Sequence, residues 1–379
     1  MALTDRMSNE KVRISFICVS LRGGGTERIV TRLANHFCRS ASVTITTVAN
    51  EDPFYALNPE IQLAMPEQAL RSRTRAIRTV GQVAHLYRSL RNQRPNCCLI
   101  FGEDIAGLAG PIARFSGVQS VLLFFRGTPR RSLSGFNGLL NPLSARLARF
   151  TVVQTEQGRE ILSGRYPKGR MRVVPNPVSI PARVTPLAQR ERIIVNVGSM
   201  GRKKNQRALI RIFARLERNA DWRLILIGDG PDRPRLEEEI QQHGLKDRIE
   251  FLGERKDIPA WLDRARVFAF TSLEEGFPNA LAEALAAGCA CVSYDCPTGP
   301  SDLIQHEGNG LLVPNDDEVA FAQQLDRLVS DEALQVRLSR QARKDIERFS
   351  EDRVLEQFDR LIAETLGHDS HSTSEPCDS

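Results

Sequence analysis

Two glutamates stand eight positions apart where the chain alternates between apolar runs and loops. Glu275 lies in the segment EEGFP, and Glu283 follows among alanines and leucines that predict a helix over 280–287. Asn279 is expected to be the N-cap of this helix, and Gly288 suits its C-terminal end. A carboxylate on such an apolar helix needs a partner, because an unpaired buried charge is costly.

The neighbouring segments predict how these two carboxylates are positioned. The apolar run Val267–Phe270 predicts a buried parallel strand, and Cys289–Tyr294 predicts the next one. A helix that begins at the carboxyl end of such a strand offers its amides to an anion such as a diphosphate. Two acidic groups beside that anion site suit a nucleotide sugar, which carries hydroxyl-rich rings on both sides of a diphosphate. Alternatively, Glu275 is a solvated loop residue and Glu283 a surface helix residue.

A glycine-rich turn follows another predicted strand. The strand Val12–Ser20 leads into Gly23, Gly24 and Gly25 and then a helix, but Arg28 occupies the place of the third glycine of a dinucleotide-binding motif. The sequence therefore gives little support to NAD binding. These glycines either let the backbone approach a ligand closely or form a tight turn without one.

Composition limits the class of protein. A chain of 379 residues is long enough for two α/β domains of ordinary size. We expect it to stay in the cytoplasm, because the N-terminus lacks a secretory signal and no apolar run is long enough to span a membrane. The eight cysteines form no C-x-x-C pair, so we expect them to be reduced and structural.

Charge is divided unevenly along the chain. Residues 1–175 contain 25 Lys and Arg against 11 Asp and Glu, a balance of +14, whereas the remainder has 27 against 35, a balance of −8. The basic half predicts an anionic partner such as nucleic acid, an anionic membrane or a lipid diphosphate. Nucleic acid is disfavoured because aromatic residues are only 6% of the chain and no nucleic-acid-binding module is present.

Arginines accompany apolar residues in two segments of the basic half. One runs from Arg71 through Arg73, Arg75 and Arg78 to Arg94, and the other from Arg130 to Phe150. Each is either an ordinary surface helix or a helix that lies on anionic lipid headgroups.

The segments EGFPNALAE, AAGCACVSYDCPTGPSDLI and GNGLLVP resemble family 4 of the retaining glycosyltransferases, and the resemblance extends from about Ile14 to Leu366. It implies the α/β GT-B fold, with two doubly wound Rossmann-like domains facing across a cleft. We expect an acceptor-side domain over 1–178, a linker over 179–191 and a nucleotide-sugar-binding domain over 192–350. Residues 351–366 are expected to form a helix that packs back on the first domain, and 367–379 a disordered tail.

The resemblance also implies an activity. Bacterial members of the family that build exopolysaccharide or lipid-linked oligosaccharide transfer a hexose or N-acetylhexosamine, with retention, from a nucleotide-diphosphate sugar to a lipid-linked or polysaccharide acceptor. UDP is favoured over GDP, and no cofactor is expected. No metal is expected either, because no D-x-D pair follows a strand. The implied location is the inner face of the cytoplasmic membrane. Alternatives are a nucleotide-sugar epimerase of the same fold, or a basic nucleic-acid- or membrane-binding protein without catalysis.

The resemblance assigns roles to individual residues. Glu275 would steady the donor sugar, and Lys204 and Arg202 would neutralise the phosphates, although Ser199 stands where the family usually has an arginine. Arg126 is expected on the acceptor side, or else in a structural ion pair with Glu103 or Asp104. The residues expected to bind the donor are Glu283 at the ribose, Gly276, Phe277, Asn279, Ala280, Gly23, Gly24, Gly25, Gly228, Asp229 and Leu252.

Overall fold

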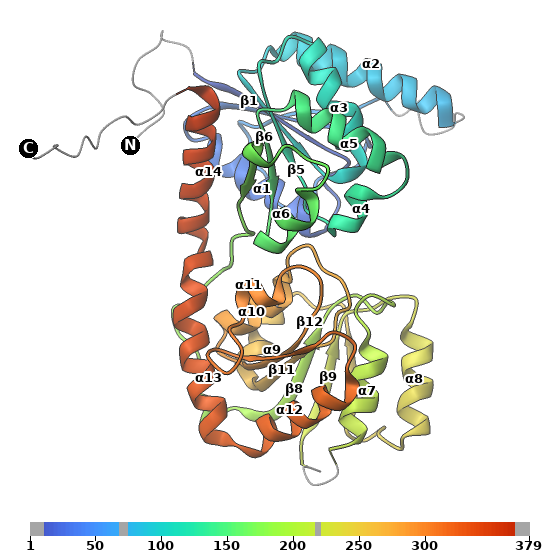
Figure 1. Cartoon of the computed structure of the whole chain (residues 1–379), viewed down its shortest axis with the longest axis vertical. Helices are drawn as coiled ribbons and strands as arrows, with labels where there is room; N and C mark the ends of the chain where they lie inside the picture. Colours follow the sequence, from blue (N-terminus) through green and yellow to red (C-terminus); the bar gives the residue numbers. More distant parts are fainter. Residues whose placement is uncertain (1–10, 68–74, 217–220, 368–379) are drawn as a thin grey trace, which may run out of the picture. The chain divides into compact units, whose positions relative to one another are not determined.

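The computed structural model describes residues 11–67, 75–216 and 221–367 (Figure 1). The chain forms two compact units. The first comprises the chain up to Val153, Arg159–Val174 and the chain from Leu355 onward, and the second comprises Gln154–Gly158 and Pro175–Val354.

The first unit is built on one parallel sheet. Its strands are β1 (Arg13–Cys18), β2 (Ser42–Thr47), β3 (Gln62–Ala64), β4 (Cys97–Phe101), β5 (Ser120–Phe124), β6 (Phe150–Val153) and β7 (Met171–Val173). They lie in the order β3-β2-β1-β4-β5-β6-β7. The helices are α1 (Gly25–Phe37), α2 (Arg75–Gln93), α3 (Glu103–Phe115), α4 (Pro129–Leu133), α5 (Gly135–Leu147) and the larger parts of α6 (Glu156–Leu162) and α14 (Glu351–Leu366), whose first residues belong to the second unit.

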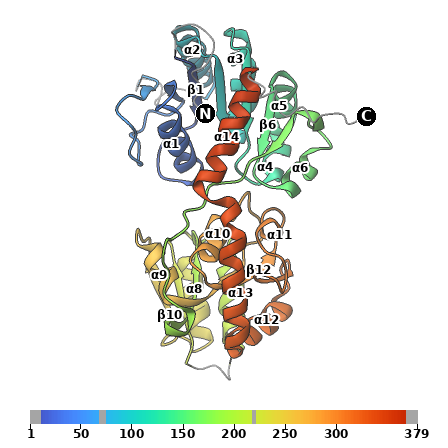
Figure 2. The same ribbon diagram turned by 90° about the vertical axis from the view of Figure 1, so that its left-hand side faces the viewer.

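Helices cover both faces of this sheet because successive side chains of each strand point to opposite sides. Ile17 and Ile100 face a core shared with α2, α3 and α5. On the other face a row of stacked rings, Phe101, Phe124 and Phe358, connects the strands to α14. Helix α14 lies on the same face as α1, to which it is joined by the hydrogen bond between His36 and Asp359 (Figure 2).

The second unit repeats the design with six strands. They are β8 (Glu191–Val197), β9 (Arg223–Ile227), β10 (Ile249–Gly253), β11 (Ala265–Phe270), β12 (Ala290–Asp295) and β13 (Leu311–Pro314), all parallel in the order β10-β9-β8-β11-β12-β13. The helices are α7 (Gln206–Ala214), α8 (Arg233–Gln242), α9 (Ile258–Arg264), α10 (Asn279–Ala286), α11 (Pro300–Leu303), α12 (Glu318–Ser330) and α13 (Glu332–Asp345).

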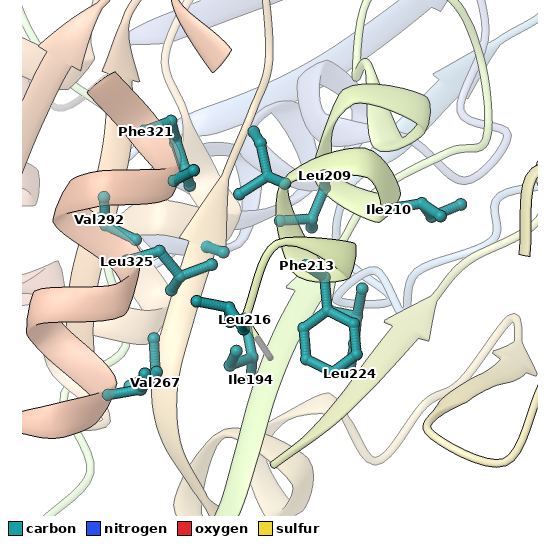
Figure 3. Packing of buried hydrophobic residues seen from close by; sticks show 14 of the residues in the cluster. Ile194, Leu209, Ile210, Phe213, Leu216, Leu224, Val267, Val292, Phe321 and Leu325 are labelled. Carbon is teal, nitrogen blue, oxygen red and sulfur yellow. The ribbon is translucent and has the colours of Figure 1, made fainter. Parts of the chain in front are cut away.

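Two apolar cores enclose the second sheet. Ile194, Val267 and Val292 face a core completed by Leu209 and Phe213 of α7 and by Phe321 and Leu325 of α12 (Figure 3). The alternate side chains of the same strands, among them Val195 and Phe268, pack against α9, α10 and α13. Burial on both faces accounts for the continuous apolar runs of these strands.

The predicted α/β class with two parallel sheets is confirmed. The residues after Asn205 predict a helix as far as Arg218, whereas α7 ends at Ala214 and Arg218 lies outside the described residues. Arg71, Arg73 and the tail from residue 368 also lie outside them. Among the described residues, no helix is long and apolar enough to cross a membrane.

Candidate functional site

Two consecutive ion pairs join the loop after β8 to the loop after β11. Lys203 Nζ lies 3.0 Å from Glu274 Oε2, and Lys204 Nζ lies 2.5 Å from Glu275 Oε1. The backbones are joined as well, because the Leu273 amide donates to the Lys203 carbonyl at 2.8 Å. The predicted site residues Lys204 and Glu275 therefore meet at the carboxyl edge of the second sheet, where parallel α/β sheets bind ligands.

Lys204 and Glu275 are held in an enclosed part of this edge. Their side chains are 25% and 12% exposed, and Lys204 Nζ lies 5.6 Å from the centre of the Phe270 ring. Both charges influence the pKa of the buried Cys296 thiol. Burial is the main cause that raises its pKa to about 12; the Glu275 carboxylate raises it further and the Lys204 ammonium lowers it.

The loop after β9 packs against the loop after β8 through glycine. Gly228 has φ +129°, and a Cβ there would overlap the Gly198 carbonyl oxygen. The Met200 amide donates to the Asp229 carbonyl at 2.8 Å, and the Gly228 amide donates to the carbonyl of Gly253 at 2.8 Å. Gly228 and Asp229 are thus fixed beside the loop that carries Lys204. Leu252 lies in the adjoining edge strand β10, one residue before the glycine that Gly228 contacts.

Helix α10 begins beside Glu275, but Asn279 is not its N-cap. Pro278 precedes the helix, and Asn279 is the first helical residue. The Asn279 side-chain oxygen, which would bind a backbone amide in an N-cap, instead accepts a hydrogen bond from Asn176 Nδ2 at 2.9 Å. Asn176 is distant from Asn279 in the sequence. The Asn279 amide donates to the Phe277 carbonyl at 2.9 Å. Helix geometry leaves the amides of the following two residues, Ala280 and Leu281, without a carbonyl inside the helix.

Glu283 lies one helical turn beyond Asn279 and is half-buried. Residues four apart share one side of a helix, so Glu283 lies on the side of α10 that also carries Asn279. Gly276 and Phe277 form the turn between Glu275 and the helix, and the Phe277 ring packs against Phe349 at 6.0 Å between centres.

Thr298, in the loop after β12, anchors the turn that carries Glu275. Its hydroxyl donates to the Glu275 carbonyl, and it adopts φ +67°. The sequence predicts no role for Thr298, because nothing local marks a threonine in a left-handed conformation. The roles of Thr298, Asn176 and the Lys203–Glu274 pair were also missed, since each depends on contacts between distant segments.

The predicted site residues of the first unit lie at the carboxyl edge of its own sheet. Gly24 precedes α1 in an extended conformation, and a Cβ on Gly23 would lie 3.2 Å from the Phe54 ring. A Cβ on Gly24 would overlap the Glu27 carboxylate, the far end of a flexible side chain. Gly25 is the first residue of α1.

Arg126 lies in the interior of the first unit. It donates to the Val174 carbonyl at 3.1 Å and lies over the rings of Phe124 and Phe358. Burial lowers its pKa to about 9, and the nearby Glu103 carboxylate raises it. Glu103 accepts a hydrogen bond from the Gly127 amide at 2.6 Å. Asp104, the other partner considered for Arg126, instead forms an ion pair with Arg131.

Comparisons with known proteins identify the family to which the chain belongs. Residues 23–180 match the family model Glycosyltransferase Family 4, and residues 182–345 match the model Glycosyl transferases group 1. A Campylobacter jejuni alpha-1,4-N-acetyl-D-galactosaminyltransferase, named for an undecaprenol-diphosphate-linked substrate, is 26% identical over 93% of this chain and 99% of its own length. The amylovoran biosynthesis glycosyltransferase AmsD of Erwinia amylovora is 23% identical over 89% of this chain and 96% of its own.

Solved structures agree in fold. The lipopolysaccharide outer core galactosyltransferase WaaB has a TM-score of 0.79 at 21% identity, covering 93% of this chain and 99% of that one. The Anabaena protein HepE, solved with UDP and glucose, has a TM-score of 0.76 at 18% identity, covering 93% and 100%. Together the two family models span most of the chain, which therefore belongs to the family 4 glycosyltransferases of GT-B fold.

Proposed function

We propose that this glycosyltransferase moves a hexose or N-acetylhexosamine from a UDP-sugar to a hydroxyl of a lipid-linked or polysaccharide acceptor, with retention of configuration. The observation that carries the proposal is the Lys204–Glu275 pair beside the first turn of α10. The full-length relative named for an undecaprenol-diphosphate-linked substrate supports the lipid-linked acceptor and the N-acetylhexosamine.

Charge stabilisation on the leaving diphosphate is the main chemical requirement of the reaction. Lys204 would supply a cation, and the amides of Ala280 and Leu281 would supply hydrogen-bond donors at the positive end of α10. An ammonium has three protons, so Lys204 can bind a phosphate oxygen and keep its bond to Glu275. Glu275 would then accept hydrogen bonds from the sugar hydroxyls and stabilise the positive charge that develops on the ring.

Residues around this pair would bind the rest of the donor. We assign Glu283 to the ribose hydroxyls, Gly276 and Phe277 to the sugar, and Gly228 and Asp229 to the floor of the nucleotide site. Leu252 would line the pocket that holds the base of the nucleotide. Gly23, Gly24 and Gly25 are assigned to donor binding as well, because glycine lets a backbone approach a ligand closely.

Arg202 would replace the arginine that the family usually places at Ser199. Its side chain is exposed in the loop that also carries Lys204, two residues away. Arg202→Ala should weaken UDP binding several-fold, and adding Ser199→Arg to that variant should restore it. Equal UDP affinity of Arg202→Ala and the unaltered protein would exclude Arg202 from the phosphate site.

Arg126 would act on the acceptor side as a positioning residue. It is buried over the aromatic rings and donates to the Val174 carbonyl, next to the Gly127 amide that Glu103 binds. The transfer is proposed to need no divalent metal and to take place at the inner face of the cytoplasmic membrane, in contact with anionic lipid. Unchanged turnover in EDTA would agree with a metal-independent reaction, and loss of turnover restored by added Mg²⁺ or Mn²⁺ would contradict it.

A thermal-shift panel of UDP-N-acetylgalactosamine, UDP-N-acetylglucosamine, UDP-glucose and GDP-mannose tests the donor class. A ligand at about 100 times its Kd stabilises the folded state by about 2.7 kcal/mol, which is readily seen as a rise in Tm. The proposal expects such a rise with a UDP-sugar and a much smaller one in Glu283→Ala. A rise with GDP-mannose alone would overturn the choice of UDP, and conversion of the donor without acceptor would indicate an epimerase.

A further inference from the structure

Helix α5 of the first unit has its large apolar residues on the outside. Phe136, Leu139, Leu143 and Leu147 are 73%, 65%, 49% and 47% exposed. Their spacing of three, four and four residues places them along one side of the helix. We call these four residues the α5 stripe.

The inward side of α5 is small and polar instead. Asn141 Nδ2 donates to the Glu103 carbonyl at 3.0 Å, and Ser144 Oγ donates to the Ala106 carbonyl at 2.8 Å. These bonds require close approach of α3 and α5, which lie side by side (Figure 1). Glycine permits it: a Cβ on Gly107 would lie 2.7 Å from Leu140 Cβ, and one on Gly110 would overlap the Ser144 hydroxyl.

This arrangement reverses the amphipathic pattern of a helix in water, where the large apolar side faces the core. The reversal is not needed for packing, because α5 is held to α3 by hydrogen bonds and small residues. A contiguous row of exposed apolar side chains on a folded domain marks a contact with a partner or a membrane.

Charge identifies the partner. No acidic residue occurs between Ile105 and Thr155, a segment that includes the α5 stripe. The same segment contains six arginines: Arg114, Arg126, Arg130, Arg131, Arg146 and Arg149. Of these, Arg130, Arg131, Arg146 and Arg149 flank the stripe and are exposed. Apolar side chains bordered by exposed arginines match an anionic bilayer, whose headgroups meet the cations while its acyl chains meet the apolar row.

A second copy of the chain fits this surface less well. A helix of 13 residues is about 20 Å long. One such row buries well below the roughly 800 Å² per partner that stable protein interfaces bury. Two copies meeting along it would also bring their exposed arginines together.

We propose that the α5 stripe is a membrane-docking surface: it inserts into the headgroup region of an anionic bilayer, with Arg130, Arg146 and Arg149 on the lipid phosphates. The inference rests on the proposed function in that a lipid-linked acceptor would be reached at this surface. It names the segment of the first unit that makes the contact.

Co-sedimentation with vesicles tests the proposal. The unaltered protein should bind vesicles of phosphatidylcholine mixed with phosphatidylglycerol and release them as salt is raised. The double variant Phe136→Ser/Leu139→Ser should bind them about tenfold more weakly or worse, because both side chains lose their contact with the acyl region. Val319→Ser is the matched control: Val319 is 57% exposed on α12 of the second unit, and its replacement should leave vesicle binding unchanged.

Several results would overturn this assignment. The first is failure of the unaltered protein to bind anionic vesicles. The second and third are binding by the double variant as strong as that of the unaltered protein, and binding to pure phosphatidylcholine as strong as to anionic vesicles. The fourth is a dimer of the unaltered protein that the double variant no longer forms. The Tm rise with UDP-sugar is read in parallel and should be the same in all variants. Absence of this Tm rise in the unaltered protein would refute the proposed donor. Absence of vesicle binding in a protein that still shows the Tm rise would refute only the docking surface.

Discussion

Replacing Lys204 and Glu275 singly and together distinguishes two roles of their ion pair. The pair either binds the donor or only holds the two loops together. Truncating one partner of a fully buried pair costs about 3–5 kcal/mol, and a surface pair contributes about 0–1 kcal/mol. With exposed fractions of 25% and 12%, the pair lies between these cases. Lys204→Met and Glu275→Gln should each lower the free energy of unfolding of the second unit by about 2 kcal/mol. The double variant should lose less free energy of unfolding than the two single variants added together, because it leaves no unpaired charge in the site.

Ligand measurements then separate the two roles. Lys204→Met should weaken UDP binding about tenfold or more in isothermal titration, because a phosphate loses its cation. UDP lacks the transferred sugar, so Glu275→Gln should leave its affinity nearly unchanged. The same variant should lower the kcat of transfer about 100-fold or more, measured as release of UDP, since the developing charge on the sugar loses its carboxylate.

The neighbouring pair provides the control. Lys203 and Glu274 join the same two loops one residue earlier, but the Lys203 side chain is 64% exposed. Lys203→Met should cost under about 1 kcal/mol and leave UDP affinity and kcat as they were. If Glu275→Gln kept full activity, or if Lys203→Met lost as much UDP affinity as Lys204→Met, the assignment of the pair to the donor would be refuted.

Three further predictions concern the frame that holds the site. Gly228→Ala should destabilise the second unit by about 2–4 kcal/mol in calorimetry, because its φ is positive and a Cβ would overlap a carbonyl, whereas Gly201→Ala, with open space around it, should have little effect. Phe358→Ala should destabilise the first unit by about 3–5 kcal/mol in urea unfolding, since the ring is fully buried between Phe124 and Arg126; a loss under 1 kcal/mol would contradict this packing. Burial raises the pKa of Glu103, so the folded state binds its proton more tightly than the unfolded state does. The stability contributed by that proton is lost as pH rises from the usual carboxyl pKa through the raised value, and Glu103→Gln should flatten this part of the profile of stability against pH.

Segments governed by local apolar patterns were predicted well. The strand predicted at Val267–Phe270 and the helix predicted over 280–287 lie within two residues of the observed β11 and α10, because their runs of buried apolar residues determine them. The N-cap assignment of Asn279 failed because Asn176, about a hundred residues earlier, takes its side-chain oxygen. Arg126 could not be placed from sequence either: its burial depends on Phe358, which a distant helix supplies.

The geometry of the candidate site follows from the order of the strands. Strands β8 and β11 are neighbours at the centre of the second sheet although two other strands, β9 and β10, lie between them in the chain, so their loops meet at one edge. Consecutive residues on the two loops then pair in register, and the same register that places Lys203 against Glu274 places Lys204 against Glu275. Of the two pairs, only the second points into the enclosed region beside Phe270 and Cys296. A single residue of register therefore separates a more exposed ion pair from the pair that we propose to act on a diphosphate sugar.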